Sequence, residues 1–255
     1  MPMVFPENDR QRGCAKCGEL TDFDFTYAFQ PMVDTQKRAI FGYEALLRDR
    51  VTRTAETVLG KVTNDNRYAF DQMCRTKAIY MASQLGLNKV LSINFLPNAV
   101  YEPRHCIQST LRTAKACGFP VENIMFEVTE SEKVMNIAHL RHIFESYRAL
   151  GSITALDDFG AGYAGLNVLA NFQPMIIKLD IELVKDIHKL EAKKIIAQAM
   201  RELTQKLGVQ LLAEGVECIE EVRFFEGLGV HLMQGFFFAK PGYEHLPEVN
   251  FAMLN

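Results

Sequence analysis

The feature that most constrains this chain is a regular alternation between short apolar runs and longer amphipathic segments. The runs 153–160 and 175–180 are typical of buried strands, and the segment 191–208 has strongly helical spacing. About eight such strands are expected, and their near-continuous apolar character indicates a mostly parallel sheet covered on both faces. An open doubly wound sheet and a closed (β/α)₈ barrel both fit. The strand count and the length of 255 residues favour the α/β barrel.

The expected elements follow one another with short connections. Two strands, 25–34 and 38–48, are joined by a polar turn at 35–37. The other expected strands are 89–94, 124–130, 153–160, 175–180, 209–215 and 231–237. The expected helices are 67–86, 107–118, 137–151, 164–172, 191–208 and 219–229. Residues 1–20 are polar and irregular and are interpreted as an amino-terminal extension, which leaves 21–255 for the barrel.

Composition narrows the class of protein. Apolar residues make up 48% of the chain and charged residues 23%, as in a globular enzyme with a large core. The net charge of −3 offers no basic excess, so duplex nucleic acid is not expected as a partner. No apolar run approaches the roughly 18 residues of a membrane-spanning helix, and the first residues do not resemble a signal peptide. We therefore expect a cytoplasmic protein without a membrane partner.

The six cysteines fall into two groups. Cys14 and Cys17 form a C-x-x-C pair within the extension, which is half of a zinc ribbon without a second pair. A feature of the tail, a metal site shared across a dimer and a redox pair all remain open for them. The other four lie inside apolar segments and are expected to be buried free thiols: Cys74, Cys106, Cys117 and Cys218.

Polar residues occur at the end of almost every expected strand. They are Glu44, Asn94, Glu127, Asp157, Asp158, Lys178, Asp180, Glu214 and Gln234. In a barrel the carboxyl ends of the strands converge on one rim, where active sites form. Asp157 and Asp158 are adjacent, although neighbouring side chains on a regular strand point to opposite faces. The sequence therefore predicts an acidic site on this rim with two carboxylates from one strand.

So many carboxylates at one rim require cations. Oxygen ligands without histidine or cysteine favour a hard ion such as Mg²⁺ or Mn²⁺ over zinc. Paired carboxylates suit two metal ions about 3.5–4 Å apart that share one aspartate, an arrangement used to hydrolyse phosphate esters. Ca²⁺ forms longer bonds to more ligands and is expected to inhibit cleavage while still permitting substrate binding.

The same residues lie in motifs that resemble the EAL-domain family of cyclic di-GMP phosphodiesterases. The motifs appear in family order over roughly residues 21–247: "EALLR" from Glu44, "SIN" to Asn94, "FEVTE" from Phe126, "DDFGAGY" from Asp157, "IKLD" from Ile177, "AEGVE" from Ala213 and "QGFFFAKP" from Gln234. The resemblance implies a TIM-like barrel in which one strand near the start runs antiparallel to the others. It also implies hydrolysis of cyclic di-GMP to linear pGpG.

The resemblance further implies a role for each matched residue. Glu44, Asn94, Glu127 and Asp157 would bind one metal ion, and Asp157, Asp158 and Glu214 the other. Lys178 would orient the attacking water, with Asp180 beside it and Gln234 bonded in the same region. Gln30, Leu47 and Arg48 would contact the dinucleotide, and Glu130 would hold the loop after "DDFG". The glycine-rich loop after Asp158 and the short helix that follows often meet a second barrel in this family, which implies a homodimer.

Three other functions fit parts of the pattern. One is a catalytically silent domain that binds the dinucleotide, which lost metal ligands would mark, and none is lost here. The second is a regulator that keeps the barrel and binds another protein. The third is a different metal-dependent barrel enzyme, which the fold alone does not exclude. The ordered motifs favour the phosphodiesterase.

Overall fold

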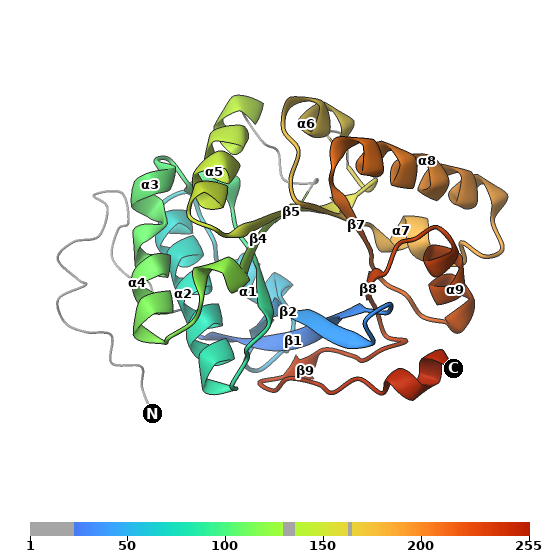
Figure 1. Ribbon diagram of the computed structural model, residues 1–255. Helices are drawn as coiled ribbons and strands as arrows, with labels where there is room; N and C mark the ends of the chain where they lie inside the picture. Colours follow the sequence, from blue (N-terminus) through green and yellow to red (C-terminus); the bar gives the residue numbers. More distant parts are fainter. Residues whose placement is uncertain (1–22, 130–135, 163–164) are drawn as a thin grey trace.

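The computed structural model describes residues 23–129, 136–162 and 165–255, and within them the sheet closes into a barrel (Figure 1). Strands β2 to β8 are neighbours in sequence order, and β1 lies between β8 and β2. The strands are β1 (Phe25–Asp34), β2 (Ala39–Asp49), β3 (Val90–Asn94), β4 (Ile124–Thr129), β5 (Ile153–Phe159), β6 (Ile176–Leu179), β7 (Gln210–Ala213) and β8 (Leu232–Gln234). Only β1 is antiparallel to its two barrel neighbours, which confirms the expected barrel with one reversed strand.

The longer helices pack around the outside of this barrel. They are α2 (Arg67–Gln84), α4 (Gln108–Ala116), α5 (Ile137–Ala149), α6 (Gly165–Asn171), α8 (Glu191–Leu207) and α9 (Ile219–Gly227). Figure 1 shows α2 and α4 on one side of the barrel and α8 and α9 on the opposite side. The sequence does not predict the three single-turn helices α1 (Glu56–Leu59), α3 (Pro103–Cys106) and α7 (Ile181–Val184). Each is too short for a helical period to emerge.

Four features of the structure differ from the expectations of the sequence. The run 231–237 is a strand only as far as Gln234, because the backbone then turns around Val216. A Cβ on Gly235 would lie 2.1 Å from the Val216 carbonyl oxygen, so the chain approaches too closely for a side chain. A short ninth strand, β9 (Gly242–Tyr243), pairs with β1 outside the barrel and is not predicted by the sequence. Cys117 and Cys218 are half-buried rather than buried.

Glu44 provides the fourth correction, because it lies in the middle of β2 and not at its end. The reason is that β2 has two partners of different extent. Its parallel pairing with β3 covers only Gly42 to Ala45, whereas its antiparallel pairing with β1 continues to Asp49. Glu44 is thus near the carboxyl end of the part of β2 that is paired on both sides, and the rest of the strand extends beyond the rim as a two-stranded ribbon.

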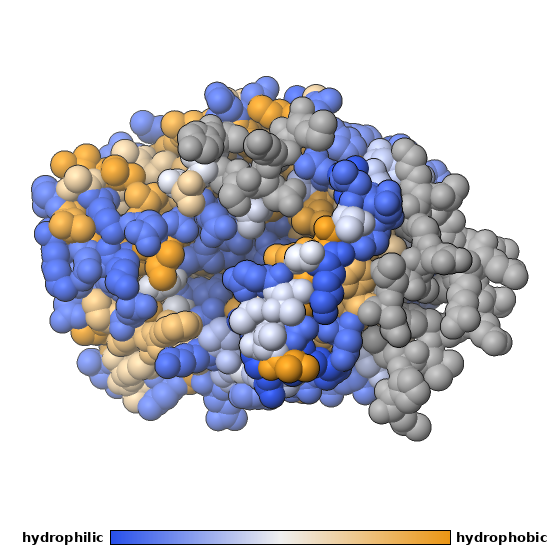
Figure 2. Space-filling model, turned by 180° about the vertical axis from the view of Figure 1, so that it is seen from behind, coloured by the Kyte–Doolittle hydropathy of each residue, from blue (hydrophilic) through white to orange (hydrophobic). Residues whose placement is uncertain are grey.

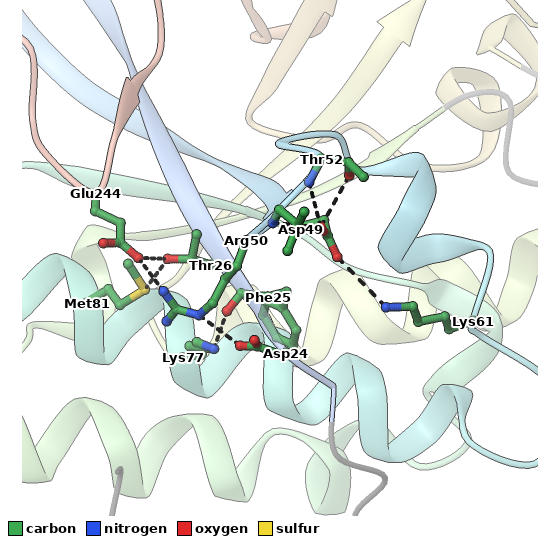
Figure 3. A network of polar contacts seen from close by, with 11 residues as sticks. Asp24, Phe25, Thr26, Asp49, Arg50, Thr52, Lys61, Lys77, Met81 and Glu244 are labelled. Carbon is green, nitrogen blue, oxygen red and sulfur yellow. Dashed lines mark hydrogen bonds and ion pairs between the residues drawn. The ribbon is translucent and has the colours of Figure 1, made fainter. Parts of the chain in front are cut away.

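A polar network ties this ribbon to β9 and α2 (Figure 3). The Arg50 guanidinium donates to Asp24 at 2.8 Å and to Glu244 at 3.0 Å, and the Thr26 hydroxyl donates to the same Glu244 oxygen at 2.6 Å. The Lys77 ammonium on α2 donates to the Phe25 carbonyl of β1. Residues from both ends of the described chain therefore hold the reversed strand in place.

The apolar core has two parts. The larger part lies between the strands and the surrounding helices, and it includes Phe126, Phe144 and Phe225. The smaller part fills the barrel interior with Met32, Val90, Met125, Ala155, Ile176, Leu212 and Leu232. This inner layer forms the floor under the residues at the rim. Among the described helices, none combines the length and apolar character needed to cross a membrane.

Candidate active site

The polar rim residues stand directly above the apolar floor because side chains alternate along a strand. Each floor residue is followed two positions later by a polar residue that points the same way. The pairs are Met125 and Glu127, Ala155 and Asp157, Ile176 and Lys178, Leu212 and Glu214, and Leu232 and Gln234. On the reversed strand β1 the order is inverted, with Gln30 before Met32. The strand period and the closure of the barrel therefore bring Gln30 and Gln234, which are 204 positions apart, into one layer.

Lys178 lies at the centre of this layer and is fully buried. Its Nζ atom is 2.8 Å from Glu214, 3.0 Å from Asp157, 3.1 Å from Glu127 and 3.5 Å from Glu44. One ammonium therefore faces four carboxylates from four strands or strand ends. Because the carboxyl groups outnumber the single ammonium, the cluster attracts further cations or protons.

Asp157 and Asp158 share the site because β5 is irregular between them. Asp158 has φ of 52°, a left-handed conformation that is uncommon for a residue other than glycine. The pairing of β5 with β6 shifts register between Leu156 and Phe159, as a β-bulge does. Oxygens of Asp157, Asp158 and Glu214 consequently lie within 4.8 Å of one another. The bulge explains how adjacent residues on one strand both reach the site.

The carboxylates form two groups that share Asp157. Glu44, Glu127 and Asp157 make the first group, and Asp157, Asp158 and Glu214 the second. Two buried amide oxygens near the first group have no hydrogen-bond partner within the described ranges: Asn94 Oδ1 and Gln234 Oε1. Buried polar atoms without partners are costly in a folded protein. Orphaned oxygens around carboxylates fit a hard, oxygen-seeking cation such as Mg²⁺ or Mn²⁺.

Two amide side chains fix the orientation of Glu44. Asn94 Nδ2 donates to Glu44 Oε1 at 3.1 Å, and Gln234 Nε2 donates to Glu44 Oε2 at 2.7 Å. Gln234 Nε2 also lies 3.2 Å from Gln30 Oε1. Because each amide turns its nitrogen toward a neighbouring oxygen, its own oxygen is left available. Glu44 is thereby held rigidly on β2, opposite Gln30 on β1.

The electrostatics of the site match this excess of carboxylates. Burial, with the nearby charges of Asp157 and Glu44, raises the pKa of Glu127 to about 8, although Lys178 opposes the shift. Burial and the charge of Asp157 raise the pKa of Asp158 to about 6. Burial also raises the pKa of Glu214. For Lys178, burial acts to lower the pKa, but the surrounding carboxylates outweigh it and the pKa is raised well above 10.5.

The remaining predicted residues lie around this centre, with one exception. Asp180 directly follows β6, and its carboxylate caps α7 by accepting a hydrogen bond from the Glu182 N–H at 2.8 Å. The charge of Asp180 also contributes to the raised pKa of Asp158. Leu47 and Arg48 are half-buried near the end of β2, and Arg48 Nη1 donates to the Leu47 carbonyl at 2.8 Å. Glu130 lies outside the described residues, as do Cys14 and Cys17.

Figure 2 shows the face that lies behind in Figure 1, where hydrophilic side chains gather around a hollow.

Sequence reasoning missed one further group of potential metal ligands, formed by His188, Cys218 and Glu221. His188 and Cys218 are 30 positions apart in the sequence, and no motif spacing connects them. A cysteine placed where a helix begins, with a glutamate three residues later, is the only local signal.

The structure is that of a (β/α)₈ barrel protein with a buried acidic centre on its rim, whose carboxylate groups could hold metal ions. Comparison with known families is more specific, because the profile of the EAL domain matches residues 18–241. The chain belongs to the EAL domain family.

Several relatives have informative descriptions. A standalone versatile EAL protein from Vibrio cholerae O395, solved in a c-di-GMP-bound form, is 52% identical with a TM-score of 0.88, over 91% of this chain and 99% of that one. Klebsiella pneumoniae BlrP1, in a complex with manganese and cy-diGMP, is 33% identical with a TM-score of 0.83, over 90% of this chain and 59% of that one.

Two of the curated relatives from Escherichia coli K12 illustrate the range of descriptions. The blue light- and temperature-regulated antirepressor BluF is 33% identical over 92% of this chain and 58% of its own length. Cyclic di-GMP phosphodiesterase PdeR is 40% identical over 45% of this chain and 17% of its own length. The chain thus spans less than two thirds of the curated relatives that it matches first.

Proposed function

We propose that this protein hydrolyses cyclic di-GMP to linear pGpG with two bound Mg²⁺ or Mn²⁺ ions. The observation that carries the proposal is the pair of carboxylate groups that share Asp157, with orphaned oxygens beside them. Support also comes from relatives whose descriptions name cyclic di-GMP phosphodiesterase activity or complexes with manganese and cyclic di-GMP. When bound, two such ions lower the pKa of water and neutralise charge on the phosphoryl oxygens.

The chain's own residues would divide the work by position. Glu44, Asn94, Glu127 and Asp157 would hold one ion, and Asp157, Asp158 and Glu214 the other. Gln234 would keep Glu44 in its binding orientation through their 2.7 Å hydrogen bond. Asn94 and Gln234 each donate a hydrogen bond to one oxygen of the Glu44 carboxylate. Loss of this carboxylate would therefore disturb the arrangement of the first carboxylate group more than loss of an exposed ligand would.

Lys178 would donate a hydrogen bond to the attacking water. Its ammonium lies between the two carboxylate groups, at 3.0 Å from Asp157 and 2.8 Å from Glu214. A charged donor in this place would orient a lone pair of the water toward phosphorus and favour its deprotonation. Asp180 would accept from the same region, and Glu130 would hold the loop after Asp158.

The dinucleotide would lie along the rim against β1 and β2. Gln30 and Arg48 would supply hydrogen bonds to it, and Leu47 an apolar contact. Arg48 is suited to a phosphate or guanine because its guanidinium is half-buried and carries a fixed charge. A homodimer through α6 and a cytoplasmic location remain predictions of the sequence.

A second candidate function is binding to a protein partner, since the relative BluF is described as an antirepressor. In that case the barrel would act through its outer surface and the acidic centre would not be needed for activity.

Product chromatography after incubation with cyclic di-GMP and Mg²⁺ tests the proposal. We expect conversion to pGpG, and a loss of about a hundredfold or more in Glu44→Ala because a ligand is removed. Glu145→Ala is a matched control, since that glutamate is exposed on α5 and pairs only weakly with Arg141. Intact dinucleotide that remains bound to the wild-type protein would identify a receptor instead, and no binding would favour the protein-partner function.

A further inference from the structure

A second cluster of metal-ligating side chains lies outside the barrel interior. His188 is in the connection between α7 and α8, Cys218 immediately precedes α9, and Glu221 is in its first turn. One ligand atom from each residue lies within 4.8 Å of the others. The cluster shares no residue with the acidic centre, and it combines a nitrogen donor from the α7–α8 connection with sulfur and oxygen donors from the start of α9.

The distance between two of the ligand atoms suits a small ion. His188 Nδ1 and Cys218 Sγ are 3.9 Å apart. Two ligands of a tetrahedral zinc ion stand about 3.5 Å from each other, given Zn–S and Zn–N bonds of roughly 2.3 and 2.0 Å. The two side chains therefore need to move by only a few tenths of an ångström, on the order of an ordinary side-chain adjustment.

Glu221 is the anchor of the cluster, because it is only 2% exposed and its carboxylate is fixed by backbone donors. Oε1 accepts from the Asp186 N–H at 2.7 Å, and Oε2 accepts from the N–H groups of Glu217 and Cys218 at 2.8 and 3.3 Å. A carboxylate offers about four lone-pair directions. The three backbone donors occupy three of them, so one remains for a further partner. The group is thus buried and held in place before any ligand arrives.

The donor set differs from that of the acidic centre. Thiolate and imidazole favour zinc-class ions, whereas oxygen ligands alone favour Mg²⁺ or Mn²⁺. Burial and the carboxylates of Glu221 and Glu220 raise the pKa of the Cys218 thiol, against one backbone N–H that lowers it. The thiol is therefore protonated at neutral pH, and an arriving ion would displace its proton to solvent.

We propose that His188, Cys218 and Glu221 bind one zinc-class divalent ion that fastens the loop after β6 to the loop after β7. Glu220 is placed to supply a fourth ligand, since its carboxylate interacts with the Cys218 thiol. The two loops begin next to Asp180 and Glu214, so the ion would stabilise the edge of the acidic centre without entering it. This inference is independent of the proposed hydrolysis.

Titration with Co²⁺ as a spectroscopic substitute for zinc tests the proposal. The full chain is used with Cys14→Ser and Cys17→Ser, so that the amino-terminal pair supplies no thiolate, and with excess Mg²⁺ to fill the acidic centre. We expect one equivalent of Co²⁺ to produce a sulfur-to-cobalt charge-transfer band in the near ultraviolet, and Zn²⁺ to abolish it. Oxygen ligands in the barrel produce no such band.

Variants assign the band to the cluster. Cys218→Ser should remove it while preserving the fold, because serine also accepts hydrogen bonds at a helix start. His188→Ala should weaken Co²⁺ binding by about tenfold or more. Cys117→Ser, a half-buried cysteine outside the cluster, should leave the band unchanged. Absence of a band in the protein with both amino-terminal cysteines replaced would overturn the proposal, and so would a band that persists in folded Cys218→Ser.

Discussion

Replacement of Lys178 by methionine removes the ammonium that four carboxylates face in the acidic centre. Methionine matches the length and apolar stem of lysine, so the change isolates the charge. Lys178 is fully buried, and its pKa is raised, so its charge is present in full at neutral pH. Removing one partner of a buried ion pair costs about 3–5 kcal/mol, because the other charge is left uncompensated.

In this site some of that cost is offset. Lys178 lowers the pKa values of Glu127 and Glu214, so without its ammonium both carboxyl groups hold their protons more firmly and stay neutral. We expect the free energy of unfolding without metal to fall by about 3 kcal/mol, the lower end of that range. In a chain of this size that corresponds to a decrease in Tm of about 6–12 °C.

Divalent ions should reverse the loss. A ligand at a hundred times its Kd stabilises a protein by about 2.7 kcal/mol, and in the variant no ammonium competes with the ions for the carboxylates. Mn²⁺ should therefore raise the Tm of Lys178→Met more than that of the wild-type protein. Thermal unfolding is followed by circular dichroism, because the chain contains no tryptophan.

Lys77→Met is the matched control. This second buried lysine on α2 donates to the Phe25 carbonyl and lies outside the acidic centre. It should lower the Tm while leaving the Mn²⁺-induced increase as in the wild-type protein. If Lys178→Met melts at the wild-type temperature without metal, or gains no more from Mn²⁺ than Lys77→Met does, the electrostatic reasoning about the site is wrong.

Three further predictions concern the ions and the fold. Ca²⁺ should permit tight binding of cyclic di-GMP with little cleavage, as measured by calorimetry and a product assay on the same samples; brisk cleavage would remove the water-activating role from the metals. Mn²⁺ affinity should rise between about pH 6 and pH 8, because carboxyl groups with raised pKa values (about 8 for Glu127 and about 6 for Asp158) must lose protons to bind metal. Affinity that stays flat over this range in a calorimetric titration would contradict those shifts. Gly235→Ala should destabilise the fold by about 3 kcal/mol or more, since its Cβ would lie 2.1 Å from the Val216 carbonyl oxygen. Gly227→Ala is the control, with open space at the corresponding position, and equal denaturation midpoints for the two variants would contradict the close approach.

The sequence predicts the barrel and the composition of its centre well, because both depend on periods that are visible in one dimension. Apolar runs mark the strands, and the polar residue two positions after an apolar floor residue marks the rim, as with Ile176 and Lys178. The convergence of Lys178 on four carboxylates is not visible in this way. It depends on how strands from distant parts of the chain are arranged around the barrel.

Other features depend on local backbone geometry or on contacts between loops. The left-handed φ of Asp158 brings two adjacent carboxylates together, whereas the sequence alone shows only two aspartates that a regular strand would separate. β9 consists of Gly242 and Tyr243, and two residues have no measurable period. His188 and Cys218 meet only because the loops after β6 and β7 are neighbours around the barrel.

Hydrolysis in water enriched in heavy oxygen tests the central claim most directly. The wild-type protein is incubated with cyclic di-GMP and Mg²⁺, and the product is analysed by mass spectrometry. If water attacks phosphorus in the acidic centre, pGpG should carry one heavy oxygen, located in its terminal phosphate, and Glu44→Ala should yield almost no labelled product. Unlabelled product, or labelled product formed equally fast by Glu44→Ala, would contradict the account.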